Sequence, residues 1–399
     1  MRRITIALAL ILVAGVWPAV PALAHGATAP QSAAAGSVRA DFNNDGADDL
    51  AIGVPDEAVG TVPGAGGVNV LYGSAAKLTG SGSQFFRQVG SAPEPFDFFG
   101  VTLASGDFNH DGFADLAVGA PLEDAGSTVD AGAVSVLYGS AGGLTTNGGQ
   151  IFTQVGSAPE TGDSFGDALA VGDFNQDGFA DLAVGADFED AGSTVDAGAV
   201  SVLYGSAAKL TRTGGQIFTQ VGSAPETGDS FGFALAVGDF NQDGFADLAA
   251  GAPFEDALST VDAGAVSVLY GSAAKLTTAG GQIFTQVGSA PETGDSFGFA
   301  LAVGDFNQDG FADLAAGAPF EDVLSTVDAG AVSVLYGSAA KLTRTGGQIF
   351  TQDSPGVPGG AEPNDFFGFA LAAGDPALST ASAAPSTPGS GAQRTVPGR

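Results

Sequence analysis

Carboxylate and amide side chains recur at alternate positions in five nine-residue segments of the form Asp-x-Asn-x-Asp-Gly-x-x-Asp, which open at Asp41, Asp107, Asp173, Asp239 and Asp305. Successive copies are always 66 residues apart. Oxygen ligands on alternate residues, with a glycine where the chain turns sharply, suit a hard cation such as Ca²⁺, which takes six to eight oxygens at about 2.3 to 2.6 Å. The pattern therefore predicts about five calcium sites, one in each repeat.

Each predicted site uses side chains at loop positions one, three, five and nine and a backbone carbonyl at position seven. Ca²⁺ affinity on the order of 10⁻⁴ to 10⁻³ M is typical of extracellular modules. The predicted ligands are Asp41, Asn43, Asp45, Ala47 and Asp49; Asp107, Asn109, Asp111, Phe113 and Asp115; Asp173, Asn175, Asp177, Phe179 and Asp181; Asp239, Asn241, Asp243, Phe245 and Asp247; Asp305, Asn307, Asp309, Phe311 and Asp313.

Two other interpretations of these segments are weaker. Asp, Asn and Gly also favour hairpin turns for local reasons, but five copies that each keep three mutually repelling carboxylates favour a cation. A helical EF-hand needs a bidentate Glu at position twelve, where the fourth copy has Ala250.

Short apolar runs around the loops predict four strands in each repeat. In the unit from Phe231 to Ser296 these are 233–237, 248–252, 265–270 and 282–286. Each is bounded by Gly, Pro, Ser, Asp or Asn, as short antiparallel strands are. A four-stranded unit at constant spacing is typical of an all-β fold, the β-propeller, in which successive sheets act as blades. Alternating Ala and larger apolar residues suit the innermost strand.

The repeat resembles the FG-GAP family, which builds the N-terminal propeller of integrin α chains and occurs in secreted bacterial proteins. Phe231-Gly232 with Gly251-Ala252-Pro253 spells the motif, as does Phe297-Gly298 with Gly317-Ala318-Pro319. The third copy departs at Asp187 and the first at Val54. The resemblance covers about residues 38 to 375 and implies a propeller with calcium loops, whose ligands dock on the face away from those loops.

Ring closure is predicted from the two ends of the repeat array. The first loop lacks a preceding Phe-Gly strand, and Phe367-Gly368 to Gly374-Asp375 supplies one without a loop after it. These halves could complete one blade and give a five-bladed ring without an open edge, which exposed strands would otherwise present. An open arc, or an arrangement of six or seven blades, stays open as the alternative.

Segments outside the repeats are predicted from composition. Residues 1–24, with Arg2 and Arg3 before an apolar run and Ala22-Leu23-Ala24 at its end, form a secretory signal peptide. The run is too short for a membrane span. Residues 25–37 form a flexible leader, residues 38–375 the propeller, and residues 376–399 a disordered tail rich in Ser, Thr, Pro and Ala. A secreted or extracellular location follows.

The charge of the chain excludes several partners. Removal of Arg2 and Arg3 with the signal peptide would take the net charge from −32 to −34, so nucleic acid and anionic membranes are not expected partners. Five Ca²⁺ ions would reduce this repulsion, and calcium binding should be coupled to folding. The absence of cysteine excludes disulfides.

Strand connectivity predicts a polarised disc. The metal loops and the turns between strands three and four, which carry the scarce basic residues, share one face. The connections on the other face carry acidic residues such as Glu160, Asp163, Glu189, Asp190 and Asp196. By analogy with the family, this acidic face is the candidate ligand surface, although a solvated charge run is an equal alternative.

Three function classes compete. The favoured one is a secreted calcium-binding adhesion or recognition module for an extracellular protein or glycan, in which repeated blades could add avidity. A structural or surface scaffold fits the near-identity of neighbouring repeats. A polysaccharide hydrolase or lyase would need a unique pair of carboxylates, and no acid stands out from its copies. We therefore expect no enzymatic activity, and the oligomeric state stays undetermined.

Overall fold

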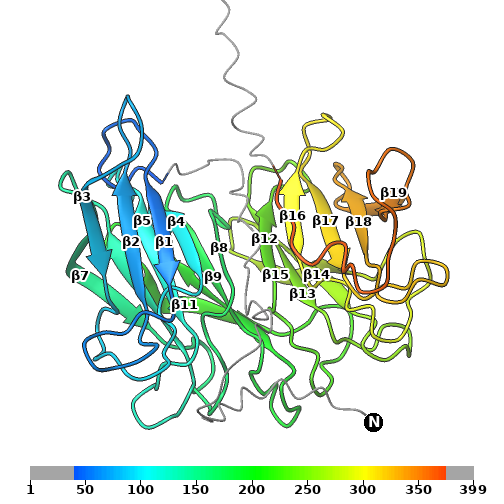
Figure 1. Cartoon of the computed structure of the whole chain (residues 1–399), viewed down its shortest axis with the longest axis horizontal. Coiled ribbons are helices and arrows are strands. Elements are labelled where there is room, and N and C mark those ends of the chain that lie inside the picture. Colours follow the sequence, from blue (N-terminus) through cyan, green and yellow to red (C-terminus); the bar gives the residue numbers. More distant parts are fainter. Residues whose placement is uncertain (1–39, 374–399) are drawn as a thin grey trace, which may run out of the picture.

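The computed structural model describes residues 40 to 373, which form an all-β arrangement of 19 strands without a helix. The strands make five antiparallel sheets, of which the first has three strands and the other four have four. Figure 1 shows the sheets following one another around an arc, with the first sheet (blue) and the fifth (yellow to orange) at its two ends. The structure thus confirms the predicted propeller-type architecture of successive blades.

Within each sheet the strands are hydrogen-bonded in chain order. The first sheet contains β1 (Leu50–Val54), β2 (Gly67–Tyr72) and β3 (Thr79–Phe86). The second contains β4 (Leu103–Gly106), β5 (Asp115–Ala120), β6 (Ala133–Tyr138) and β7 (Thr145–Phe152). The third contains β8 (Leu169–Gly172), β9 (Asp181–Ala186), β10 (Ala199–Tyr204) and β11 (Thr211–Phe218). The fourth contains β12 (Leu235–Gly238), β13 (Asp247–Ala252), β14 (Ala265–Tyr270) and β15 (Thr277–Phe284). The fifth contains β16 (Leu301–Gly304), β17 (Asp313–Ala318), β18 (Ala331–Tyr336) and β19 (Thr343–Phe350).

The predicted strands of the fourth repeat agree with these bounds except at the outermost strand. Strand β15 begins at Thr277, five residues before the predicted start at Gln282. The Gly280-Gly281 pair suggested a turn, but the structure accommodates it within the strand, where the pairing register with β14 shifts between Val268 and Tyr270. The missing side chains leave room for close neighbours, since a Cβ at Gly281 would lie 2.8 Å from Val221 Cγ1 and one at Gly280 would lie 2.7 Å from Lys341 Nζ.

The core lies between successive sheets rather than within any one of them. The innermost strands β4, β8, β12 and β16 contact one another in order. One hydrophobic cluster, for example, joins Val134 and Phe152 of the second sheet to Leu182 of the third. Each sheet therefore buries its apolar side chains only against its neighbours, which is how repeat architectures build a continuous core.

The predicted ring closure is not formed among the described residues, and the open arc is the arrangement observed. Phe367 donates its N–H to Ala329, 2.9 Å away, and thereby docks on the fifth sheet as Phe297 docks on the fourth. Residues 367–373 form no strand, and none of the described residues pairs with them. Gly374 and Asp375 lie outside the described residues.

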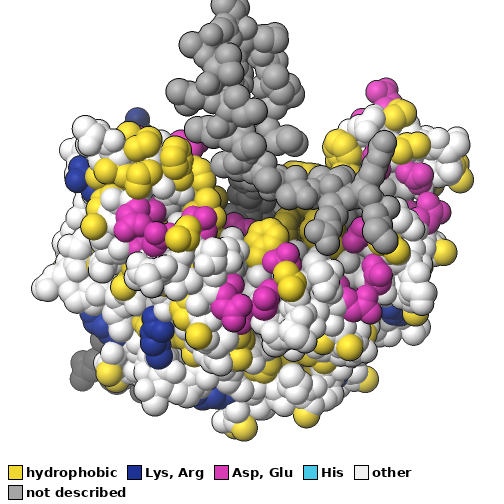
Figure 2. All heavy atoms as spheres, turned by 90° about the horizontal axis from the view of Figure 1, so that it is seen from below, with side chains coloured by type: hydrophobic (Ala, Val, Ile, Leu, Met, Phe, Trp, Pro, Cys, Tyr) yellow, Lys and Arg dark blue, Asp and Glu magenta, His cyan; other side chains and the backbone are white. Residues whose placement is uncertain are grey.

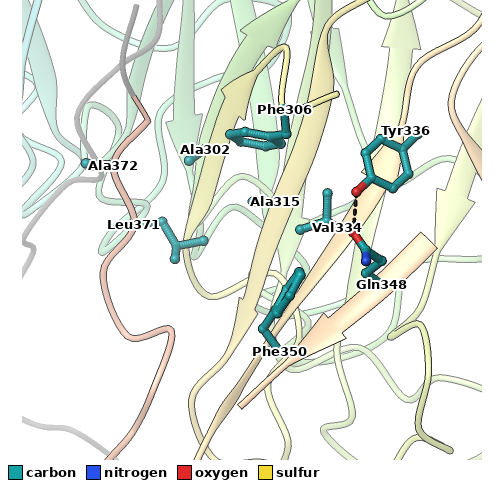
Figure 3. A pocket seen from close by; sticks show the side chains of 9 residues that line it. All are labelled: Ala302, Phe306, Ala315, Val334, Tyr336, Gln348, Phe350, Leu371 and Ala372. Atoms are coloured by element: carbon teal, nitrogen blue, oxygen red, sulfur yellow. Dashed lines mark hydrogen bonds between the residues drawn. The ribbon is translucent and has the colours of Figure 1, made fainter. Parts of the chain in front are cut away.

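Both ends of the arc consequently present apolar surface. On the first sheet Leu50 and Ile52 are 44% and 39% exposed, whereas their counterparts in the third sheet, Leu182 and Val184, are fully buried. The outer face of the fifth sheet is hollowed between Phe306, Tyr336 and the C-terminal segment (Figure 3). These faces match the buried interfaces between the other sheets, but among residues 40 to 373 no further sheet covers them.

The predicted signal peptide, the leader and the tail from residue 376 lie outside the described residues. Within residues 40 to 373 no helix has the length and hydropathy needed to cross a membrane.

Candidate functional site

The five predicted metal loops lie at one end of the sheets, where four of them connect the innermost strand to the second and the first directly precedes β1. In the second repeat the loop runs from Asp107, after β4, to Asp115, the first residue of β5. His110 at loop position four has φ 55° and Gly112 at position six has φ 88°. The glycine therefore stands where the chain adopts a left-handed turn, as predicted, because residues with a Cβ rarely adopt that conformation.

The side chains of each loop fold back onto its own amides. In the second repeat the two oxygens of Asp107 accept the N–H groups of Asp111 and Gly112, at 3.1 and 2.9 Å. Asp111 Oδ1 accepts the N–H of Phe113 at 3.0 Å. An ionised carboxylate oxygen has further lone pairs, so these contacts orient the oxygens and leave them able to hold a cation.

The ninth-position aspartate acts first as a structural clamp. Asp115 is fully buried, and its two oxygens accept the N–H groups of Phe108, at the start of the loop, and Gly139, after β6, both at 2.9 Å. Burial raises the pKa of Asp115 to about 7, partly offset by these two hydrogen bonds, and the neighbouring charges of Asp107 and Asp111 add to the rise. Such mutual repulsion is what a bound cation would relieve.

Successive metal loops are joined to one another by backbone hydrogen bonds. The carbonyl of Asp107 accepts the N–H of Ala180 in the next loop, 3.1 Å away, and the carbonyl of Phe108 accepts the N–H of Ser206, 3.2 Å away. The same pair of bonds recurs between the other neighbouring loops. The conformation of one loop therefore bears directly on the interface with the following sheet.

The predicted ligands of each loop are brought close together, but their side chains do not converge on one point. Among the described residues, no three His, Cys, Asp or Glu side chains form a group that could hold a metal ion. The donor chemistry nevertheless fits a hard cation, since each loop offers carboxylate, amide and carbonyl oxygens and no nitrogen or sulfur ligand. Calcium at these loops thus stays a proposal.

The basic residues of the neighbouring turns are engaged between sheets rather than free to bind a ligand. Lys275 Nζ donates to the carbonyl of Gly214, 2.6 Å away, and lies 3.8 Å from the ring centroid of Tyr204 in the preceding sheet. Lys209 and Lys341 make the equivalent contacts. Tyr138, Tyr204 and Tyr270 pack between sheets, and the cation over each ring adds to that contact.

The expected acidic face requires a correction. Asp163 and Glu189 are 2% and 4% exposed, so they contribute little to the surface and lie instead between neighbouring sheets. Acidic residues also remain at the opposite end, where loop residues such as Asp111 are exposed. Figure 2 shows acidic side chains in separate patches rather than in one continuous rim.

A row of phenylalanines on the end away from the metal loops was not predicted as a site. Phe233 precedes β12, and its ring centroid is 4.9 Å from that of Phe299 and 6.4 Å from that of Phe254. Phe299 in turn lies 4.8 Å from Phe369, which is 37% exposed. The sequence contained a sign of this row, because the second and third repeats have Val101 and Asp167 at the position that Phe233 and Phe299 occupy in the later repeats.

Two exposed leucines lie in the same connections as two phenylalanines, Leu258 after Phe254 and Leu324 after Phe320. Leu258 and Leu324 are 81% and 96% exposed and have φ angles of 56° and 59°. Gly126 and Gly192, both with φ 70°, occupy the position in the second and third repeats. A leucine in a left-handed conformation is unusual, and such strain concentrates at functional sites. We name Phe233, Phe254, Phe299, Phe320, Leu258 and Leu324 the apolar patch.

Comparison with known proteins supports the resemblance. The FG-GAP repeat model matches residues 99–137, 165–203, 231–269 and 297–335. Phosphatidylinositol-glycan-specific phospholipase D of Rattus norvegicus is 36% identical over 163 residues, which are 40% of this chain and 19% of that protein.

Integrin alpha chains are similar over comparable stretches. Integrin alpha-3 of Cricetulus griseus is 38% identical over 144 residues, which are 35% of this chain and 12% of that protein. Integrin alpha-8 of Gallus gallus is 31% identical over 248 residues, which are 58% of this chain and 21% of that protein. The chain therefore spans about a fifth or less of the length of these relatives.

Proposed function

The chain is an FG-GAP repeat protein, and from this premise we propose that it is a secreted, calcium-stabilised adhesion or recognition module for an extracellular protein or glycan. The similarity to integrin alpha chains supports a recognition role. The similarity to a phospholipase D covers only 19% of that enzyme and supplies no reason to propose the same activity here.

The observation that carries the proposal is the exposure of Leu258 and Leu324 in the apolar patch. A solvent-exposed leucine at positive φ stabilises nothing within its own chain, and a glycine would fit the same backbone better. Large apolar side chains that are exposed together typically mark an interaction surface. Aromatic residues beside them provide contact area at low conformational cost. Leucine tips favour a protein over a glycan as the ligand.

Calcium has a supporting role in this proposal. The loops lie at the other end of the sheets from the apolar patch, so the cation would not touch the ligand. It would hold neighbouring loops, and through their backbone links the neighbouring sheets, in a fixed arrangement. The residues that would hold it are the predicted oxygen donors of each loop, such as Asp239, Asn241 and Asp243.

The proposal is tested by binding of the mature chain to an array of extracellular proteins and glycans, with millimolar calcium and with chelator. A matched variant replaces Leu258 and Leu324 by glycine, the residue found in the second and third repeats. We expect a defined ligand that the variant loses at least tenfold in affinity while its stability is unchanged or higher. Equal binding by the variant would refute the assignment of the apolar patch. No ligand for the native chain would favour the scaffold alternative.

A further inference from the structure

Four clusters of buried polar side chains, away from the metal loops, lie where neighbouring sheets meet. The fourth cluster contains Asp295, Glu321, Gln286 and Ser289. Gln286 and Asp295 belong to the connection between β15 and β16, and Glu321 belongs to the connection between β17 and β18. The other three clusters precede it at intervals of 66 residues and contain Glu123, Glu189 and Glu255 in the place of Glu321. We call them the inter-sheet acid clusters.

Each cluster brings two carboxyl groups together out of solvent. Asp295 is 1% exposed and Glu321 is 5% exposed. The Asp295 carboxyl contacts that of Glu321, and burial, the largest cause, together with the proximity of Glu321 raises the pKa of Asp295. Asp295 Oδ2 accepts the N–H of Glu292 at 2.6 Å. Two charges this close are unfavourable in a buried place unless something neutralises them.

The backbone holds both acids in position. The N–H of Glu321 donates to Ala318, 3.2 Å away, and the carbonyl of Glu321 accepts the N–H of Gly330, 2.9 Å away. These bonds fix the loop that carries Glu321, so its side chain is presented to the neighbouring sheet by a defined turn.

Unpartnered polar atoms are concentrated at these clusters. Glu321 Oε2, both amide atoms of Gln286 and the hydroxyl of Ser289 are buried without a hydrogen-bond partner. Gln286 is only 3% exposed, and its side chain lies beside the Glu321 carboxyl. The Gln286 and Ser289 side chains both face the Glu321 carboxyl. Buried polar atoms almost always have a partner, so this convergent set of polar atoms is suited to a ligand that contacts several of them at once.

The glutamate and glutamine atoms are unpartnered in every copy, and the serine hydroxyl is unpartnered in three of the four. The equivalent glutamate Oε2 and both equivalent glutamine amide atoms recur in all four clusters. Among the described residues, one other buried side-chain oxygen shares this state, Asp187 Oδ1. Because the unpartnered glutamate and glutamine atoms recur at four interfaces, they are a regular property of the packing between sheets and not one local irregularity.

We propose that each inter-sheet acid cluster binds a hard divalent cation, Ca²⁺ or Mg²⁺, between two neighbouring sheets. Its two carboxylates, one amide oxygen and one hydroxyl are the oxygen donors that such cations prefer. The two negative charges match the charge of the ion. This site is separate from the loops, because its residues come from the connections at the other end of the sheets.

Radioactive calcium in equilibrium dialysis with the full mature chain tests the proposal. The test variant carries Glu123→Gln, Glu189→Gln, Glu255→Gln and Glu321→Gln, which keep side-chain volume and leave every loop intact. We expect it to bind four fewer ions per chain, with Mg²⁺ competing for those four sites. An unchanged number of bound ions in a folded variant would overturn the proposal and indicate that each carboxyl pair shares a proton.

Three further variants make the result independent of the metal loops and of folding. Glu57 is the exposed counterpart, in the first repeat, of the four cluster glutamates. Glu57→Gln should therefore leave the number of bound ions unchanged. The single variant Glu321→Gln, with its folding verified by circular dichroism, should lose one ion by native mass spectrometry. Asp→Asn at loop position five in all repeats should leave the four inter-sheet ions bound even if the loop ions are lost. Loss of all ions from this loop variant in its folded state would also contradict the proposal.

Discussion

The carbonyl oxygen of Asp239 accepts the backbone N–H of Ala312, 3.2 Å away in the loop of the following repeat. Asp239 is the first predicted calcium ligand of its loop, and Ala312 immediately precedes the ninth-position Asp313. A substitution that changes the conformation of one metal loop should therefore also change the packing of the next sheet. Backbone hydrogen bonds in this way link a proposed cation loop to the interface between neighbouring sheets.

Loop substitution should reduce the stabilisation by calcium. Asp177→Ala removes an exposed carboxylate from the third loop, and we expect it to lower the calcium-dependent gain in unfolding free energy by about 1 to 3 kcal/mol. Urea denaturation in calcium and in chelator measures this gain. The matched control is Glu160→Gln, which removes an exposed charge at the other end of the sheets. A similar loss in both variants would show a general charge effect.

The ninth-position aspartate should matter even without calcium. Asp247 is fully buried, and its oxygens accept the N–H groups of Phe240 and Gly271 at 3.0 and 2.9 Å. Asp247→Asn turns an NH₂ group toward one of these donors, so we expect a loss of about 2 to 4 kcal/mol in chelator. The exposed Asp243→Asn should cost less than about 0.5 kcal/mol there. Equal losses of unfolding free energy in the two variants would contradict the structural role of the buried aspartate.

The metal-free chain should lose stability as the pH rises. Burial, the largest cause, raises the pKa of Asp181 and Asp247 to about 8. Acids with a raised folded pKa bind more protons in the folded state, so their contribution is complete below the unfolded pKa and is lost as the pH rises through the folded value. The melting temperature in metal-free buffer should be higher at about pH 6 than at about pH 8. Calcium should restore it at the higher pH, and an increase with pH in metal-free buffer would contradict this.

The hydroxyl of the tyrosine that ends the third strand of each repeat should add to the unfolding free energy only where another sheet follows. Tyr204 Oη accepts the N–H of Leu276, 3.3 Å away in the next sheet, and is hydrogen-bonded to Gln216. Tyr204→Phe should cost about 1 to 2 kcal/mol. Tyr336→Phe, on the open end of the arc, should cost less than about 0.5 kcal/mol. Equal costs in chemical denaturation would show that a further sheet covers Tyr336.

The other end of the arc gives a matching prediction. Ile52 is 39% exposed and its counterpart Val184 is fully buried. Ile52→Thr should therefore change the unfolding free energy by less than about 0.5 kcal/mol, whereas Val184→Thr buries a hydroxyl and should cost about 1 to 3 kcal/mol. A large cost at both positions would indicate a closed ring in solution.

The sequence was sufficient to predict the four-stranded blades and the position of the loops, but the closed ring that it suggested is not formed among the described residues. Periodic apolar runs placed β14 at Ala265–Tyr270 to the residue, because its ends are marked by Gly264 and Gly271. The glycine pair inside β15 misled the prediction, since only the paired strand shows that a register shift accommodates it.

Contacts between repeats could not be predicted in the same way. Asp163 and Glu189 lie 26 residues apart in sequence, and as charged residues in polar loops they suggested exposed surface. Only the packing of one sheet on the next buries them together. The apolar patch was visible as departures from the repeat at Phe233 and Leu258, but the exposure that makes them notable required the structure.

Calorimetric unfolding of the mature chain across a titration of free calcium tests the central claim most directly. If cations at the loops hold neighbouring sheets together, the melting temperature should rise steadily as free calcium passes through about 10⁻⁴ to 10⁻³ M. The transition should stay single, because the sheets depend on one another. A melting temperature that is the same in chelator and in millimolar calcium would contradict the account.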